Sequence, residues 1–248
     1  MIQQNNPVLI TGATSGIGLE LLHLYHALGH LVIAHGRSET RLSKLCDQFS
    51  GVHSIKADLG DADAVDAMMA QVMADFPDLS LVINNAAIQN DGRMTDAEFS
   101  ASSAKKEIAI NFLAPVLICR AVITHQIAKR RGRVRIVNVS SGLAFFPKTS
   151  SAFYCASKAA LHSFSQSLRY QLASADAAVA ISEVFLPVVD TPMTSARNVR
   201  KMSAKQAAMA IHDGIEAGQD EIYVGKARWI PLISRISPAL MKSILRNG

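Results

Sequence analysis

Two residues one helical turn apart, Tyr154 and Lys158, could perform acid–base chemistry together. They stand in the run YCASK, and residues four apart lie on the same helix face. Two unit charges about 5 Å apart interact by about 3 kcal/mol at an effective dielectric constant of 20, or roughly two pKa units. The lysine is therefore expected to lower the tyrosine pKa towards neutrality, as a general acid/base requires. Such pairs also occur on ordinary surface helices.

A glycine-rich turn near the N-terminus could bind a phosphate-containing cofactor. Gly12, Gly16 and Gly18 follow the apolar run Val8–Thr11 and precede a leucine-rich helix. Glycines let the backbone turn sharply and approach a pyrophosphate, and the helix N-terminus supplies free N–H groups. This strand–turn–helix context predicts a dinucleotide site, rather than a merely tight turn. The expected cofactor contacts in the turn are Gly12, Thr14, Ser15, Gly16, Ile17 and Gly18.

The residues after the next two strands bear on the choice of dinucleotide. Arg37 and Ser38 follow the second strand, where a NAD site places a carboxylate for the ribose 2′-hydroxyl. A guanidinium and a hydroxyl suit a 2′-phosphate instead, so NADP(H) is predicted over NAD(H), although an exposed loop arginine would look the same. Asp58 and Leu59 follow the third strand. Asp58 either accepts from the adenine amino group or caps a helix.

The elements that must position these residues alternate along the chain. Seven runs rich in β-branched residues predict strands, with 3.6-periodic apolar segments between them: Val8–Thr11, Leu31–Ala34, His53–Ala57, Leu81–Asn84, Val134–Ser140, Val179–Phe185 and Glu221–Val224. This alternation predicts an α/β fold of the Rossmann type, a doubly wound, seven-stranded parallel sheet with helices on both faces. Residues 1–248 are expected to form one domain, in which 188–205 is a mobile substrate lid.

Composition excludes several classes of protein. The chain has 248 residues, 49% of them hydrophobic, and a net charge of +5. No run approaches the roughly 18 consecutive apolar residues of a membrane span, and no leader is evident, so a cytoplasmic protein is expected. The three cysteines, Cys46, Cys119 and Cys155, lack zinc-ligand spacing, so no metal site is predicted.

The basic excess lies entirely in residues 197–248, which hold nine basic and four acidic side chains. Residues 226–248 form a basic amphipathic tail, interrupted by Pro231 and Pro238. Such a tail either docks on protein, which we favour, or makes weak contact with an anionic membrane surface. Because the rest of the chain is neutral, no nucleic-acid partner is expected.

Taken together, the motifs resemble those of the short-chain dehydrogenase/reductase family, single-domain type, from about Val8 to Phe185. The matching runs are TGATSGIG (Thr11–Gly18), NNAA (Asn84–Ala87), AINFLAP around Asn111, VSSG (Val139–Gly142) and YCASK (Tyr154–Lys158). In that family a serine precedes the tyrosine by 13 residues, which selects Ser141. The tail is more weakly similar to a bacterial branch named after the D-alanine-transfer operon.

The resemblance implies a role for each matching residue. Tyr154 would exchange the proton of a carbonyl or alcohol, Lys158 would lower its pKa and hold the cofactor ribose, and Ser141 would bind the substrate oxygen. Asn111 would hold a water that relays protons to Lys158. Further cofactor contacts would come from Asn85, Ala86, Pro187, Val189 and Thr191, while Asn84 would tie strands together. Family members commonly form homodimers or homotetramers through the helices that hold Asn111 and Tyr154.

The expected reaction is hydride transfer between the nicotinamide and a carbonyl or secondary alcohol. Apolar candidates for the pocket wall suggest a hydrophobic ketone or aldehyde: Phe145, Phe146, Phe153, Val188 and Met193. Lys148 and Arg197 could bind an anion or simply be solvated. Ala87 and Val188 replace glycines of the family pattern, so an NADP(H)-binding sensor that has lost turnover is the alternative.

Overall fold

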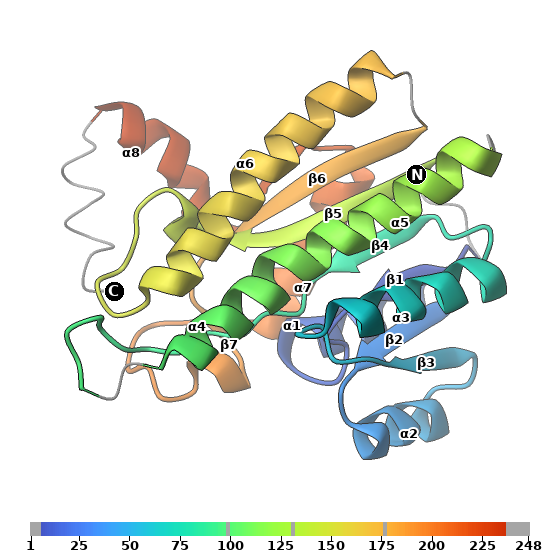
Figure 1. The fold of residues 1–248 in the computed structure, drawn as a ribbon, viewed down its shortest axis with the longest axis horizontal. Coiled ribbons are helices and arrows are strands. Elements are labelled where there is room, and N and C mark those ends of the chain that lie inside the picture. The colour runs from blue at the N-terminus through green and yellow to red at the C-terminus, as the bar shows by residue number, and fades with distance from the viewer. Residues whose placement is uncertain (1–5, 98–99, 130–131, 176–177, 237–248) are drawn as a thin grey trace.

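The computed structural model describes residues 6–97, 100–129, 132–175 and 178–236. Its centre is a parallel sheet of seven strands in the order β3-β2-β1-β4-β5-β6-β9 (Figure 1). All seven predicted strands are present, and their ends lie within two residues of the predicted ones. The strands are β1 (Val8–Ile10), β2 (Val32–Gly36), β3 (Val52–Lys56), β4 (Leu81–Asn84), β5 (Val134–Ser141), β6 (Val179–Leu186) and β9 (Glu221–Tyr223). The predicted doubly wound α/β fold is confirmed.

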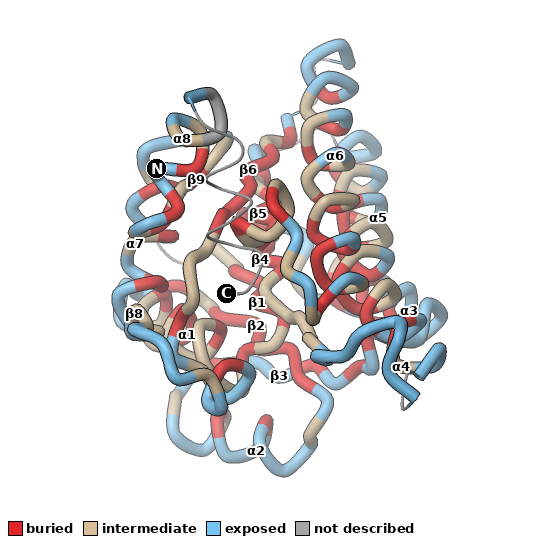
Figure 2. Tube along the Cα trace, turned by 90° about the vertical axis from the view of Figure 1, so that its left-hand side faces the viewer, coloured by how far each residue is buried: buried red, intermediate tan, exposed pale blue. Residues whose placement is uncertain are grey.

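Helices cover both faces of the sheet, as Figure 2 shows. One face carries α1 (Gly16–Ala27), α2 (Glu39–Gln48) and α7 (Ala204–Glu216). The other carries α3 (Ala62–Asp75), α4 (Ala101–Ile108), α5 (Ala114–Lys129) and α6 (Ala152–Ser174). Right-handed crossovers between parallel strands require this two-sided arrangement.

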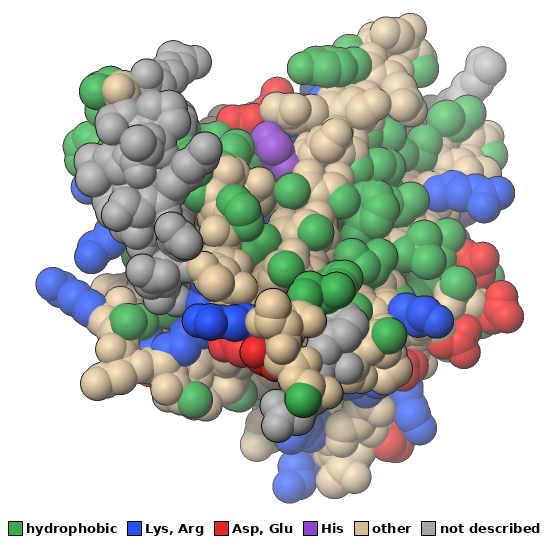
Figure 3. Space-filling model, turned by 60° about the vertical axis from the view of Figure 1, so that its left-hand side comes forward, with side chains coloured by type: hydrophobic (Ala, Val, Ile, Leu, Met, Phe, Trp, Pro, Cys, Tyr) green, Lys and Arg blue, Asp and Glu red, His purple; other side chains and the backbone are tan. Residues whose placement is uncertain are grey.

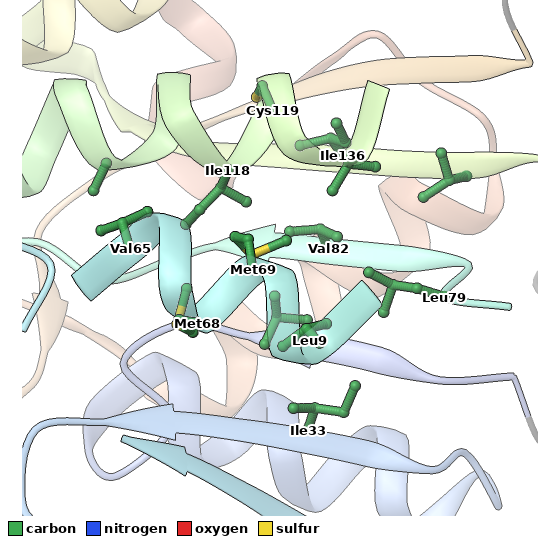
Figure 4. Close-up of a cluster of buried hydrophobic side chains, with 14 of the residues drawn as sticks. Leu9, Ile33, Val65, Met68, Met69, Leu79, Val82, Ile118, Cys119 and Ile136 are labelled. Carbon is green, nitrogen blue, oxygen red and sulfur yellow. The ribbon is translucent and has the colours of Figure 1, made fainter. Parts of the chain in front are cut away.

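Alternate strand residues supply the two cores. Leu9, Ile33 and Val82 point towards α3 and α5 (Figure 4), whereas Val8, Ile10 and Val32 pack under α1 and α7. Successive side chains of a strand face opposite sides, so strands covered on both faces read as continuous apolar runs. Each fully buried aliphatic side chain contributes about 1.5–3 kcal/mol, which makes the sheet a rigid base for the loops at its carboxyl edge.

A continuous helical run, Ala101–Lys129, is long and apolar enough to cross a membrane by length and composition alone. Its α5 part packs on α3 and β5, and Ile118, Cys119 and Val122 are buried in the core. The run is therefore a core helix of the fold. Residues Ala109–Leu113 in its middle form a π-helical turn, which holds Asn111.

The segment after β6 contains secondary structure that the sequence did not predict. Two short strands, β7 (Val189–Asp190) and β8 (Met202–Ser203), pair in parallel, and Pro192–Thr194 form a 3-10 turn. The pairing of β7 with β8 joins the two ends of the predicted lid, 188–205. Its mobility stays a prediction.

The start of the C-terminal tail packs on its own chain. Gly225–Trp229 form a 3-10 helix that leads into α8 (Ile230–Ile236). Ala227 and Ile230 are buried in a cluster with Phe146 and Phe185. Ala227 and Ile230 thus dock on the chain's own core, whereas Trp229, Leu232 and Ile236 are about half exposed or more. The rest of the tail, 237–248, lies outside the described residues, so docking of the whole tail stays a prediction.

Candidate active site

The glycine-rich turn has the geometry that a pyrophosphate cradle needs. Gly12 and Gly16 adopt positive φ angles of +67° and +55°, which residues with a side chain rarely adopt. A Cβ at Gly18 would lie 2.2 Å from the Gly12 carbonyl oxygen, so only glycine permits α1 to approach the turn this closely. The residues present fit a dinucleotide at this turn.

Neighbouring strand ends hold the turn in place through residues that the sequence analysis missed. The His35 imidazole accepts from the Gly12 N–H (3.2 Å) through Nδ1 and reaches the Ala57 carbonyl (3.2 Å) through Nε2. Burial lowers the pKa of His35 to about 4, so the ring stays neutral and can keep both bonds. The Thr11 hydroxyl accepts from the N–H groups of Asn85 (2.9 Å) and Ala86 (3.0 Å). His35 and Thr11 end adjacent strands, and that position was the available signal.

Arg37 and Ser38 line the cavity beside this turn, as predicted for a 2′-phosphate site. Arg41, one helical turn further, lines it too and was missed. The Ser38 hydroxyl accepts from the Arg41 N–H (3.4 Å) as the N-cap of α2. Two guanidinium groups at this position suit a dianionic phosphate.

Asp58 does not reach the cavity wall, whereas Leu59 does. The Asp58 carboxylate accepts from the Gly60 N–H (2.9 Å) and thereby fixes the turn before α3. The N-cap of α3 is Asp61, not Asp58. A local turn bond is thus the role that the structure shows for Asp58, because its carboxylate oxygen lies within reach of a free N–H two residues on.

Ser141 and Tyr154 meet where β5 ends and α6 begins. Tyr154 is only 8% exposed, and burial raises its pKa to about 12, opposed by the Ser141 hydrogen bond and by the Arg197 charge. The predicted lowering of this pKa by Lys158 is wrong for this structure. The ammonium lies 5.8 Å from the centre of the Tyr154 ring and donates to the Val139 carbonyl (2.8 Å), so desolvation outweighs its charge.

Lys158 is a buried cation, 3% exposed. Burial lowers its pKa to about 8, and the negative charge of Glu183 opposes this shift. Glu183 is fully buried on β6 and pairs with His162, one turn after Lys158 on α6, at 2.8 Å. The other carboxylate oxygen, Oε1, has no hydrogen-bond partner among the described residues. Glu183 thus acts electrostatically on the lysine from the neighbouring strand β6.

Asn111 lies behind the cavity wall, fully buried in the π-helical turn. Its amide donates to the Ile88 carbonyl (2.8 Å) and accepts from the Ile88 N–H (2.9 Å). It also donates to Ser157 (3.2 Å), whose hydroxyl donates to the Tyr154 carbonyl (2.7 Å). Among the hydrogen bonds of the described chain, none joins Asn111 to Lys158, so the water relay stays a prediction. Asn84 bonds Asn138 on β5 (2.9 Å), which confirms that it ties strands together.

One cavity of about 1480 Å³ joins the glycine turn to the Ser141–Tyr154 pair. Of the predicted catalytic and cofactor-binding residues, all but Gly18, Asp58 and Asn111 line it. Gly18 and Asn111 are buried, and Asp58 is exposed. Of the predicted pocket-wall residues, Val188 and Met193 line the cavity, whereas Phe145, Phe146 and Phe153 do not. Ala87 also lines the cavity. In the part of the chain that the structure describes, no group of three or more His, Cys, Asp or Glu side chains could hold a metal ion.

Comparisons with known proteins agree with this geometry. A family model described as short chain dehydrogenase matches residues 6–202. The chain is 36% identical over 228 residues to a protein of Bacillus subtilis (strain 168) named uncharacterized oxidoreductase DltE, covering 90% of this chain and 89% of that one. It shares 25% identity and a TM-score of 0.86 with a short chain dehydrogenase from Burkholderia cenocepacia in complex with NADP, over the full length of both chains. A short chain dehydrogenase/reductase from Burkholderia phymatum in complex with NAD gives a TM-score of 0.85 at 20% identity, covering 100% and 98%.

Proposed function

The chain belongs to the short-chain dehydrogenase/reductase family of NAD(P)-dependent oxidoreductases, and we propose that it uses NADPH to reduce the carbonyl group of a hydrophobic ketone or aldehyde. The observation that carries the proposal is the single cavity in which a glycine cradle faces Ser141, Tyr154 and Lys158. It supports turnover over the sensor alternative, because a sensor needs no buried acid beside its cofactor.

In the proposed reaction the protein handles the proton. When bound, NADPH supplies a hydride to the carbonyl carbon. Ser141 donates a hydrogen bond to the carbonyl oxygen and Tyr154 gives it a proton. A phenol with a pKa of about 12 is protonated at neutral pH, which favours reduction. Lys158 then stabilises the phenolate that is left behind. The test is loss of NADPH absorbance over a panel of ketones, aldehydes and quinones.

The preference for NADP(H) rests on Arg37, Arg41 and Ser38. An Arg37→Asp variant replaces an attractive charge by a repulsive one, so its Kd for NADPH is expected to rise about 100-fold and its Kd for NADH to change little. Cofactor fluorescence measures both constants. Arg93→Asp, the same charge change at an exposed residue outside the cavity, is the control. Equal weakening of both cofactors by Arg37→Asp would contradict the preference.

The buried carboxylate of Glu183 is expected to set the pH range of activity. In Glu183→Gln, a residue of the same shape can still bond His162, but the charge that favours protonated Lys158 is gone. The pKa of Lys158 should fall further below its usual value, so the high-pH limb of kcat should move to lower pH. Glu221→Gln removes a partly exposed carboxylate from the adjacent strand and serves as the control. A limb that moves equally in both variants would show that Glu183 has no special effect.

Two further proposals concern the setting of the enzyme. Free cysteines fit a reducing compartment, which supports a cytoplasmic location.

Leu113 (42% exposed), Ile127 (56%) and Tyr170 (71%) present apolar surface on the π-helical turn, α5 and α6. Such surface supports a homodimer or homotetramer through these helices.

A further inference from the structure

All charged side chains that the structure describes in the cavity wall are basic. Among the described residues that line it, nine are Lys or Arg and none is Asp or Glu. They are Arg37, Arg41, Lys148, Lys158, Arg197, Arg200, Lys201, Lys226 and Arg228. A chain whose net charge is only +5 has thus concentrated cations in one place. A single-sign cleft raises the local concentration of ligands of the opposite sign.

The proposed cofactor accounts for only part of this charge. Arg37 and Arg41 lie at the adenine end, beside Ser38, and Lys158 lies at the reacting centre. The other six come from the loop before α6, the segment 188–205 and the 3-10 helix Gly225–Trp229. Figure 3 shows Lys and Arg side chains gathered at the lower left of the face that it presents, with carboxylates beside some of them.

Two of these six cations already have carboxylate partners. Lys148 pairs with Asp91 (3.6 Å), and Lys201 pairs with Asp190 (3.6 Å). No carboxylate of the described residues lies within 4.0 Å of the charged nitrogens of Arg197, Arg200, Lys226 or Arg228. Half-buried Arg197 stands out among these four, because its charge acts on both the Tyr154 phenol and the Asp91 carboxylate. Arg197 is therefore an unpaired cation at the reacting end.

The Asp91 carboxylate is bound mainly by groups other than Arg197. Its Oδ1 accepts from Ser151 and from Gln89 (3.2 Å) and pairs with Lys148 (3.6 Å), whereas no ion pair within 4.0 Å joins Asp91 to Arg197 among the described residues. The guanidinium of Arg197 lines the cavity and has no carboxylate partner within 4.0 Å in the described part of the chain. It is therefore suited to bind the carboxylate or phosphate group of a ligand.

Several apolar side chains also line the cavity. Leu143, Met193, Val199, Trp229, Ile230 and Ile233 line it. The guanidinium carbon of Arg228 lies over the Trp229 ring, 5.4 Å from the ring centre. Apolar walls and a few placed cations together select a ligand with an apolar body and a charged end.

We infer that the substrate is a carbonyl compound with an apolar chain and a carboxylate or phosphate group, which Arg197 binds. This inference rests on the proposed reductase function and narrows its substrate class. Arg197 would orient the ligand so that its carbonyl lies against Ser141 and Tyr154.

The experiment compares methyl ketones that share the reacting group and differ in the group at the far end of the chain. NADPH consumption is measured with 7-oxooctanoate, with 7-oxooctyl phosphate and with the neutral 7-oxooctanamide. Wild type is expected to prefer one of the two anions over the amide by at least about 10-fold in kcat/KM. Arg197→Gln should reduce that preference by about 10-fold, and Arg197→Lys by less. Lys205→Gln, which removes an exposed charge outside the cavity, should leave the preference unchanged.

The ratio of kcat/KM for the anion to kcat/KM for the amide reports binding of the charged group. An effect of Arg197 on Tyr154 changes kcat/KM for both substrates equally, so it cancels in this ratio. Calorimetric binding of octanoate, octyl phosphate and octanamide to the NADP⁺-loaded protein gives a second readout without turnover. Tighter binding of an anion that depends on Arg197 supports the anion-binding role of Arg197, even if no ketone is reduced and the proposed function fails. Equal use or binding of the anions and the amide overturns the inference and leaves the reductase function standing. An Arg197→Gln variant that weakens NADPH binding and keeps the anion preference would place Arg197 in the cofactor site and also overturn it.

Discussion

Replacing Tyr154 by phenylalanine is expected to lower kcat/KM for carbonyl reduction by about 1000-fold and to leave NADPH binding within about twofold. The phenol is the buried acid that faces Ser141 in the cavity, and general acid–base catalysis contributes typically about 10²–10⁴-fold. Phenylalanine keeps the ring and its packing, so the fold should be unchanged. Initial rates and cofactor fluorescence on the same preparation measure both quantities.

Tyr170→Phe is the matched control, because Tyr170 lies on the same helix and is 71% exposed. Its rate should equal that of wild type. Turnover that survives in Tyr154→Phe would refute the assignment of the acid. Absence of turnover in wild type with every carbonyl, despite tight NADPH binding, would favour the sensor alternative.

Much of the fold could be predicted because the local signals agree with one another. The central strands of the sheet are buried on both faces, so they appear in the sequence as apolar runs such as Val8–Ile10. The glycine turn could also be predicted, because Gly12 and Gly16 adopt positive φ and Gly18 lies against the Gly12 carbonyl, where a Cβ would not fit. These requirements exist at the level of one residue and its immediate neighbours.

The features that could not be predicted depend on long-range packing. The Tyr154 pKa follows from burial by distant segments, which the spacing of Tyr154 and Lys158 does not contain. Strands β7 and β8 have two residues each, too few for a periodic pattern. Asp58 fitted both an adenine contact and a helix cap; the structure shows a turn bond to the Gly60 N–H instead of the cap, and the adenine contact stays a prediction. Glu183 did carry a signal that was overlooked, an acidic residue within the buried strand Val179–Leu186.

Replacing Lys158 by methionine is expected to lower turnover by about 100-fold or more and, at the same time, to stabilise the protein. The buried ammonium donates to Val139, and desolvation lowers its pKa to about 8, so the native state bears an unfavourable charge at neutral pH. An apolar side chain of similar length removes this cost, although the Val139 carbonyl loses its donor. The net gain in the free energy of unfolding should be about 1–2 kcal/mol at pH 7, measured by urea denaturation.

The sign of the pH dependence distinguishes this cause from better packing. Between about pH 8 and the ordinary lysine pKa of 10.5, native Lys158 has lost its proton while the unfolded chain still holds one. Wild-type stability therefore rises with pH in this window. By about pH 9.5 the wild type should gain about 2 kcal/mol from this group, so the advantage of Lys158→Met should vanish. Lys205→Met, at an exposed position of α7, should show neither the activity loss nor the pH-dependent gain. An advantage that is equal at both pH values would mean that Lys158 carries no burial penalty, and the argument that its charge is held at a cost to stability would be wrong.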